Sequence, residues 1–285
     1  MERNTTGLSP ANRRAARALK ALGPVFAGTV YLFLLAPIII VIVMSFNSAL
    51  YLSFPPKGFS LRWYGRYFSD PIYIDSSLKS LLVGAGAVLL STVFGTMAAY
   101  ALQRYRPPMY GLINAMILSP LLLPGVVMGL ALLYTLSTLG LGRSMISVVL
   151  GHTLYVLPFV VIIVSSALQG CERHLEEVAM SLGASQWYAF RTVTLPIIFP
   201  GIVSGALFAF ILSLDEFIIT FLLGGVHVIT LPIRIFTSLR FAVDPTIAAV
   251  STVFVFVTTI LFVVATRLKA RERQTKIPST GKGGF

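Results

Sequence analysis

Long apolar stretches divide this sequence and constrain its fold more than any other feature. Each runs for about 20 residues or more, the length that an α-helix needs to cross the hydrocarbon core of a bilayer. The first extends from about Pro24 to Phe46, which is longer than the apolar core of a cleaved signal peptide. Five more are expected at roughly 78–102, 111–137, 145–168, 197–223 and 245–267. The predicted fold is all-α, a polytopic membrane protein with six transmembrane helices.

The composition agrees with a membrane protein and offers no catalytic apparatus. Only 11% of the residues are charged, against about 25% in soluble domains. A single cysteine, Cys171, cannot form an intramolecular disulfide, and the three scattered histidines argue against a metal site. The chain has no G-x-x-x-x-G-K-[ST], H-E-x-x-H, G-x-S-x-G or C-x-x-C motif. We therefore expect neither enzymatic activity nor a cofactor bound by this chain.

The Lys and Arg residues behind the net charge of +12 are unevenly distributed along the chain and indicate its membrane topology. With six spans both tails lie on one side of the membrane, and that side holds fifteen of the 22 Lys and Arg residues. The positive-inside rule then places both termini in the cytoplasm. Residues 1–22 and 268–285 are the expected cytoplasmic tails, and residues 23–267 the membrane domain. No basic face of a soluble domain is present, so nucleic acid is not an expected partner.

The polar interval from Glu177 to Pro196 separates the fourth and fifth spans and is itself patterned. A short amphipathic helix is expected from about Glu172 to Leu182. Its apolar face comprises Leu175, Val178, Ala179 and Leu182, and its polar face Glu172, Arg173, Glu176 and Glu177. Anionic lipid headgroups would repel this acidic face, so the pattern favours a surface that docks a protein partner.

The second half of the same interval carries the signals of a helix–turn–helix. Gly183 stands where a helix end requires a residue that tolerates positive φ. Ser185 can cap a second short helix that carries aromatic residues. Leu195-Pro196 then opens the next span with a proline in the first turn, where its missing N–H costs least.

Two adjacent acids, Asp215 and Glu216, fall within the fifth span. A charge at mid-bilayer costs about 3 kcal/mol, so such residues usually face a bundle interior or a water-filled path. Successive helical residues differ by ~100° in direction, so the two acids cannot share one face. Glu216 lies on a stripe with Gly205, Ala209, Ser213 and Thr220, and Asp215 on one with Ser204, Phe208, Ile211 and Leu222. A cation-attracting path and a structural hydrogen bond are both open readings.

Small residues and prolines predict how the spans pack. Gly125-x-x-x-Gly129 and Gly201-x-x-x-Gly205 permit close contacts between helices. Prolines inside the apolar runs free backbone carbonyls and predict kinked or broken helices. They are Pro37, Pro120, Pro124 and Pro158.

The polar interval resembles the EAA loop of the permeases of binding-protein-dependent ABC importers with the type I fold. Glu177-Val178-Ala179, three residues, Gly183, nine residues and Val193-Thr194-Leu195-Pro196 follow the pattern E-A-A-x3-G-x9-I-x-L-P. Val178 and Val193 depart mildly from it. The resemblance extends over most of the chain to spermidine/putrescine permeases of the C-subunit type. Segments that match are Ser45-Phe46-Asn47-Ser48, Gln103-Arg104-Tyr105-Arg106, Leu157-Pro158-Phe159-Val160-Val161, Ser213-Leu214-Asp215-Glu216 and Leu231-Pro232-Ile233-Arg234-Ile235.

The resemblance implies a permease of a bacterial inner membrane, with a coupling loop at residues 170–195. The implied partners are a second permease, two cytoplasmic ATPase subunits that bind ATP and Mg, a periplasmic or surface solute-binding protein, and membrane lipids. The implied contacts to the ATPase come from Glu177, Ala179, Gly183, Ala184, Ser185, Leu195 and Pro196. Asp215, Glu216 and Ser213 are the candidate residues of the substrate path.

The implied cargo is a polyamine such as spermidine or putrescine, or a related opine or amino-acid-like solute. Permeases of polyamines often have two aspartates where this chain has Asp215-Glu216, so Asp215 is the better substrate candidate by resemblance, while the stripe favours Glu216. The alternatives are a self-sufficient proton-coupled secondary transporter that uses Asp215 or Glu216, and an assembly subunit that moves no solute. The first would leave the Glu177 loop without a role and lacks the internal repeats of such transporters.

Overall fold

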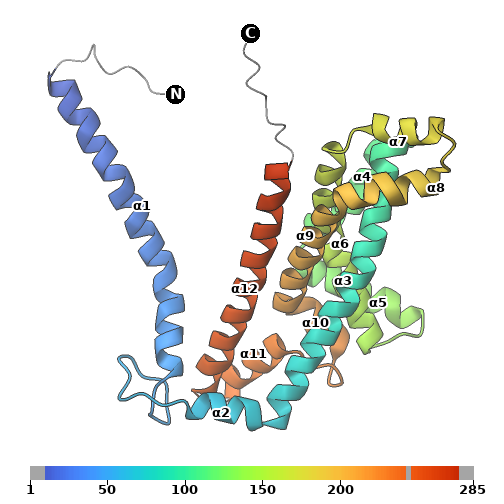
Figure 1. The fold of residues 1–285 in the computed structure, drawn as a ribbon. Coiled ribbons are helices and arrows are strands. Elements are labelled where there is room, and N and C mark those ends of the chain that lie inside the picture. The colour runs from blue at the N-terminus through green and yellow to red at the C-terminus, as the bar shows by residue number, and fades with distance from the viewer. Residues whose placement is uncertain (1–9, 242–244, 276–285) are drawn as a thin grey trace. The chain divides into compact units, whose positions relative to one another are not determined.

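The structure is a computed structural model that describes residues 10–241 and 245–275 (Figure 1). The outermost parts of the two expected tails, 1–9 and 276–285, lie outside these residues. Within the described ranges the regular elements are helices, apart from an isolated antiparallel bridge between Asn47 and Phe59. The all-α prediction is confirmed.

In chain order the elements are α1 (Pro10–Ser45), α2 (Arg62–Ser69), α3 (Pro71–Tyr105), α4 (Tyr110–Leu118), the 3-10 turn η1 (Ser119–Leu121), α5 (Gly125–Thr138), α6 (Met145–Gln169), α7 (Arg173–Ser181), α8 (Gln186–Ala189), the π-helical turn η2 (Phe190–Thr194), α9 (Leu195–Asp215), α10 (Ile218–Gly224), α11 (Leu231–Phe241) and α12 (Thr246–Thr275). Five of the described helices are long and apolar enough to cross a membrane, and a bent pair makes up to six. The predicted spans at 78–102, 145–168 and 245–267 fall in α3, α6 and α12.

The predicted span at 111–137 is wrong as one continuous helix. Tyr110–Leu121 and Gly125–Thr138 meet at an angle of 106°. Pro120 lies inside η1, and Pro124 is the N-cap of α5 with an extended ψ of 134°. Proline has no N–H to donate to the preceding turn, so the helical hydrogen bonding is interrupted here and α5 begins after Pro124. The expectation that these two prolines break a helix is confirmed.

The predicted span at 197–223 is also wrong as one helix. It divides into α9, which ends at Asp215, and α10, which begins at Ile218. Glu216 between them has an extended backbone, with ψ of 114°. Its side-chain Oε1 accepts a hydrogen bond of 2.9 Å from the Ile219 backbone N–H, which satisfies a free donor at the start of α10.

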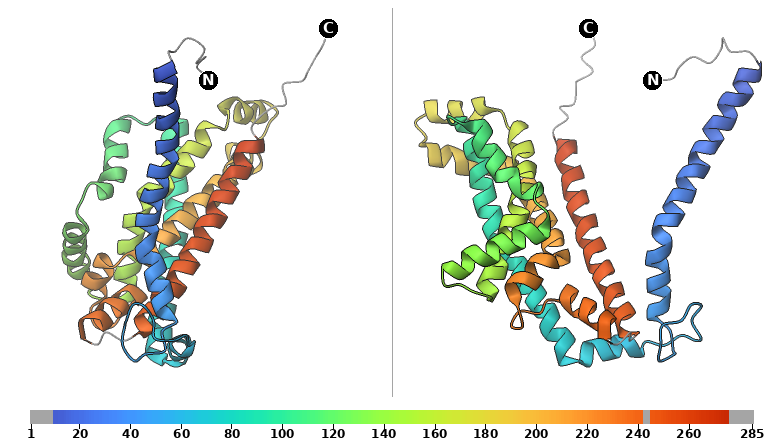
Figure 2. Two further views of the ribbon diagram at one scale, coloured as in Figure 1. Left: turned by 90° about the vertical axis from the view of Figure 1, so that its left-hand side faces the viewer. Right: turned by 180° about the vertical axis from the view of Figure 1, so that it is seen from behind.

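Helices α3, α6 and α9 pack side by side and form the centre of the bundle, with α10 and α5 beside α6 (Figure 2). Valine on α6 makes up much of the core, and the buried face of α9 consists mostly of small residues. A Cβ added at Gly201 would lie 2.5 Å from the Cβ of Ala167, and Gly205 faces Val160. Gly129 approaches Leu222 of α10 in the same way. The small-residue pairs therefore pack helices closely, as the sequence predicts.

The chain forms two compact units. The first lies within Met1–Arg66 and Val243–Thr252. In it the Trp63 indole N–H donates to the Asn47 carbonyl at 2.7 Å, and the Ser45 and Tyr64 hydroxyls are 2.6 Å apart. The apolar segment Gly23–Ser45 of α1 has no buried residue in its most apolar window, as expected of a helix that faces lipid. The second unit, Tyr67–Ala242 and Val253–Phe285, holds both candidate sites.

Candidate functional site

The polar interval between α6 and α9 folds as the sequence predicts. Helix α7 occupies Arg173–Ser181, flanked by Glu172 and Leu182 as its caps. Gly183 has φ of +90°, a conformation that side chains other than glycine adopt at a cost. The Ser185 hydroxyl accepts a hydrogen bond of 3.3 Å from the Tyr188 N–H and caps α8.

Glu176 fastens this loop to the bundle, a role that its pattern did not reveal. Only 6% of the residue is exposed, so its assignment to the solvent-facing side of α7 is wrong. Arg104, near the end of α3, donates from Nε to Glu176 Oε1 at 3.0 Å. The Thr194 hydroxyl donates to the same oxygen, and the Tyr100 hydroxyl donates to the other at 3.3 Å. The carboxylate therefore joins both ends of the loop to α3.

Arg104 makes a second contact in the same place. Its Nη2 donates to the carbonyl of Cys171 at 3.1 Å, just before α7 begins. Arg173 donates in turn from Nη1 to the carbonyl of Arg104 at 3.2 Å. With side chains only 9% and 8% exposed, Arg104 and Glu176 form a buried ion pair, and each charge has further hydrogen-bond partners. Removing either member of such a pair is strongly destabilising, because the remaining charge is buried without compensation.

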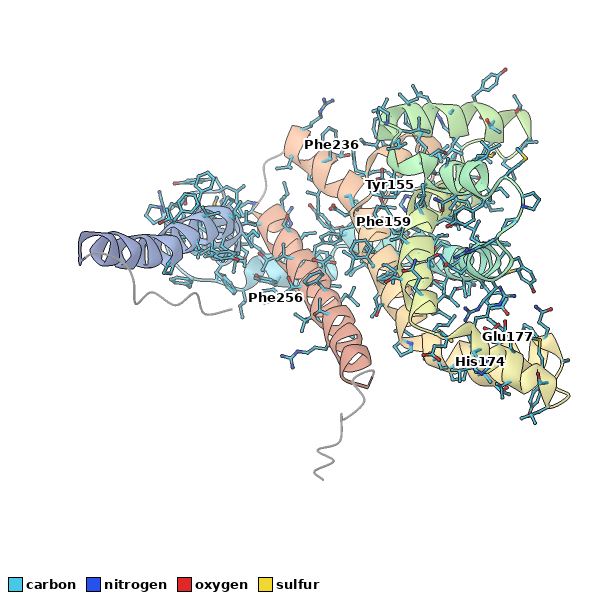
Figure 3. All side chains as sticks on the ribbon, turned by 90° about the horizontal axis from the view of Figure 1, so that it is seen from above. Tyr155, Phe159, His174, Glu177, Phe236 and Phe256 are labelled. Carbon is cyan, nitrogen blue, oxygen red and sulfur yellow. The ribbon has the colours of Figure 1, made fainter. Side chains whose placement is uncertain are left out.

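Glu177, in contrast, lies on the outside of the loop with half of its side chain exposed. It pairs with Arg173 at 3.1 Å and approaches His174 at 3.9 Å. Figure 3 shows His174 and Glu177 together on the loop, apart from the α6 residues Tyr155 and Phe159. The apolar side of α7 is also uncovered, since Leu175 and Val178 are each 43% exposed and Leu182 is 85% exposed.

Four of the expected ATPase-contacting residues line one hollow of about 550 Å³ on the loop: Ala179, Gly183, Ala184 and Ser185. Leu182 and Tyr188 complete its walls. Leu195 and Pro196 lie elsewhere, at the junction of the loop with α9. The sequence-predicted residues thus divide between the outer surface of the loop and its junction with α9.

The junction is a continuous helix. The Leu195 N–H donates to the Phe190 carbonyl five residues back, in the π-helical pattern, and α9 follows without a break. The missing N–H of Pro196 falls in the first turn of α9, as predicted. Gln186–Asp215 is therefore one helical segment of 30 residues that joins α8 to a candidate membrane span.

At the far end of that segment, Ser213 and Glu216 have structural partners. The two ring nitrogens of His152 lie 2.8 Å from the Ser213 hydroxyl and 2.7 Å from the Thr220 hydroxyl, so His152 spans the break between α9 and α10. This buried hydrogen bonding gives His152 a structural role. Glu216 is half-buried and caps α10. Of the three predicted path residues, Asp215 alone is exposed, and within the described residues no hydrogen bond or ion pair is found for its carboxylate.

The described residues thus form an apolar helical bundle with a polar loop outside its core. The loop is anchored by a buried ion pair and continues into one of the candidate spans, as in a polytopic membrane protein. Residues 91–274 match the family described as "Binding-protein-dependent transport system inner membrane component". The chain belongs to this family and is a permease of an inner membrane.

Two relatives among known proteins resemble nearly the whole chain. The "Spermidine/putrescine transport system permease protein PotC" of Haemophilus influenzae is 34% identical over 241 residues, which cover 84% of this chain and 93% of the relative. The "Putrescine transport system permease protein PotI" of Escherichia coli K12 is 35% identical over 254 residues, which cover 87% and 90%.

A solved structure supports the fold independently. One chain of a bacterial ABC transporter involved in the import of the acidic polysaccharide alginate superposes with a TM-score of 0.73 at 18% identity. The superposition covers 89% of this chain and 97% of that one. The fold is therefore the transmembrane fold of ABC importers.

Proposed function

We propose that this chain is one of two permease subunits of a binding-protein-dependent ABC importer for small cationic amines, with putrescine or spermidine as its cargo. The names of the two relatives that cover more than four fifths of the chain support this cargo. The proposed partners are a similar permease, two cytoplasmic ATPase subunits and a periplasmic or surface solute-binding protein. Both termini and the α7–α8 loop face the cytoplasm, in line with the distribution of Lys and Arg.

The observation that carries the coupling role is the construction of the α7–α8 loop. Its inner side is fixed to α3 through Glu176 and Arg104, while Leu175, Val178 and Leu182 are exposed to water. Apolar side chains gathered on a polar loop mark a protein interface. We assign the docking face to Glu177, Ala179, Gly183, Ala184 and Ser185, and its occupant to an ATPase subunit that binds ATP and Mg.

Transport then follows from the connection between the loop and α9. Closure of the ATPase pair displaces the loop, and the continuous helix Gln186–Asp215 conveys that displacement through Leu195 and Pro196 into the membrane. Alternating access requires that ATP binding favour one arrangement of the helices and its hydrolysis the other. The buried ion pair makes α3 move with the loop.

Recognition of an amine is proposed at Asp215. Its exposed carboxylate attracts a cation, and this attraction between unit charges grows stronger where water is excluded from the path. Tyr155, one ring of an aromatic row on α6 and α9, lies within electrostatic range of Asp215 and Glu216. Aromatic faces add attraction for ammonium groups. Ser213 supports this part of the path through its hydrogen bond to His152.

The complete transporter, reconstituted with its solute-binding protein, tests the proposal with a panel of solutes. Putrescine and spermidine are expected to stimulate ATP hydrolysis and to accumulate in the vesicles, whereas neutral and acidic solutes of similar size are not. Stimulation by an acidic or neutral solute alone would overturn the cargo but leave the coupling role in place. Membership of the permease family does not favour the alternative of a proton-coupled secondary transporter.

A further inference from the structure

A groove lies between α3 and the second half of the loop. Its lining includes the rings of Tyr100, Tyr105, Trp187 and Phe190, together with Met97 and Thr96. Its volume is about 350 Å³. Pockets that hold small, mostly apolar ligands occupy roughly 300–1,000 Å³.

The walls of the groove are preformed. The Phe190 ring contacts Tyr100 with centroids 4.8 Å apart and stacks on Trp187 at 5.6 Å. Tyr105 meets Tyr100 edge-on, and its hydroxyl accepts a hydrogen bond from the Gln186 amide. The open side is strongly apolar, since Met97 is 63% and Trp187 68% exposed. No charged side chain lines this groove.

The groove lies where two spans end. One wall is the last part of the span Pro71–Tyr105, and the other is the first part of the span Gln186–Asp215. Tyrosine and tryptophan are enriched at the boundary between hydrocarbon and headgroups. Two exposed arginines, Arg106 and Arg191, follow Tyr105 and Phe190 directly in the sequence. Each wall is thus followed in the chain by a cationic residue, which suits an occupant that combines an apolar chain with an anionic group.

We propose that this groove binds an anionic phospholipid, with an acyl chain between the aromatic walls and the phosphate beside Arg106 and Arg191. Guanidinium groups form strong hydrogen bonds with phosphate oxygens.

The size of the groove favours a lipid over a protein chain. A stable protein interface covers about 800 Å² on each partner, which is a broad surface. This groove is a narrow hollow between two helices, lined by a handful of side chains. Because α3 forms one wall and the coupling loop the other, a bound lipid ties the position of the loop to the bilayer. The effect of this link on transport rests on the proposed function, but lipid binding itself does not depend on the cargo.

Photolabelling of the complete transporter in nanodiscs tests the site. The probes are phosphatidylglycerol and phosphatidylcholine, each with a diazirine in the acyl chain, and labelled peptides are mapped by mass spectrometry. We expect both walls, 96–105 and 186–190, to be labelled at least about fivefold more by phosphatidylglycerol, the ratio that roughly 1 kcal/mol from a basic residue gives. The double variant Arg106→Gln and Arg191→Gln is expected to abolish this preference. Arg173→Gln, an exposed arginine on α7, is the matched control and keeps it.

Two outcomes would overturn the proposal. Equal labelling by phosphatidylglycerol and phosphatidylcholine would show that the groove does not select an anionic lipid. Absence of label from both walls of the complete transporter would remove the site, and label confined to the isolated subunit would show that a partner chain covers the groove. Amine uptake measured on the same preparations separates these failures from failure of the proposed function, because uptake with unlabelled walls leaves the importer assignment intact.

Discussion

Replacing Glu176 by alanine tests how the coupling loop is held. The substitution leaves Arg104, whose side chain is only 9% exposed, without its carboxylate, and it deprives the Thr194 and Tyr100 hydroxyls of their acceptor. Removing one member of a buried ion pair typically costs about 3–5 kcal/mol. This cost falls on the attachment of the loop to α3 rather than on the bundle as a whole, because all three partners converge on the Glu176 carboxylate.

Hydrogen exchange of the assembled transporter measures that attachment. Exchange of loop amides follows the population of locally open states, so a loss of about 3 kcal/mol raises it by roughly 100-fold, at about 1.4 kcal/mol for each factor of ten. The increase is expected across residues 173–194 and not in the centre of α6. Uptake should fall with it, because a detached loop moves without displacing α3.

The neighbouring residue provides a matched control. Glu177→Ala removes an exposed ion pair, worth about 1 kcal/mol or less, so loop exchange is expected to change by no more than about fivefold. The double variant Glu176→Leu and Arg104→Met removes both charges and is expected to recover most of the protection, since apolar replacement of a buried pair is often neutral. If Glu176→Ala exchanged no faster than Glu177→Ala, the buried anchor would be refuted.

Four further substitutions have definite expected outcomes. Gly183→Ala places a Cβ at φ of +90° and is expected to cost about 1–2 kcal/mol, measured as a lower unfolding temperature and weaker coupling of ATP hydrolysis to uptake. Asp215→Asn should lower uptake of putrescine at least about fivefold at unchanged stability, because even in water a charge pair at 4 Å is worth about 1 kcal/mol. Glu216→Ala removes the cap of α10 and should cost about 1 kcal/mol of thermal stability. Ser213→Ala leaves one buried nitrogen of His152 unpaired and should cost about 1–3 kcal/mol, measured by thermal unfolding.

These outcomes separate structural roles from transport roles. Undiminished uptake in Asp215→Asn would show that Asp215 does not select the cargo by charge. A loss of uptake confined to Glu216→Gln would assign that role to Glu216. An unfolding temperature of Ser213→Ala equal to that of the unmodified protein would contradict the buried hydrogen bond to His152. Full coupling in Gly183→Ala would show that the turn tolerates a side chain.

The coupling loop was largely predictable from the sequence because its signals are local. Gly183 and Ser185 act on their own backbone or on residues three positions away, and an apolar periodicity of 3.6 needs only one helix. Glu176 could not be found in this way. Its partner, Arg104, is 72 residues distant in the chain, and three neighbouring acids look alike until the fold selects one of them.

The two broken spans also differ in whether the cause of the break is local in the sequence. Pro120 and Pro124 indicate their break through local chemistry, although the apolar run alone predicts one continuous helix where the structure has two at 106°. The break after Asp215 has no proline. It is stabilised by the Glu216 side chain and by His152 on another helix. Because His152 is distant in the chain, the hydropathy pattern predicts one apolar helix where the structure has two.

Energy coupling can be measured most directly in proteoliposomes that contain either this chain alone or the complete transporter with its solute-binding protein. The account predicts that radiolabelled putrescine accumulates only with the complete transporter and ATP on the ATPase side, and that an imposed proton gradient does not replace ATP. Accumulation by this chain alone, driven by a proton gradient without an ATPase, would contradict it.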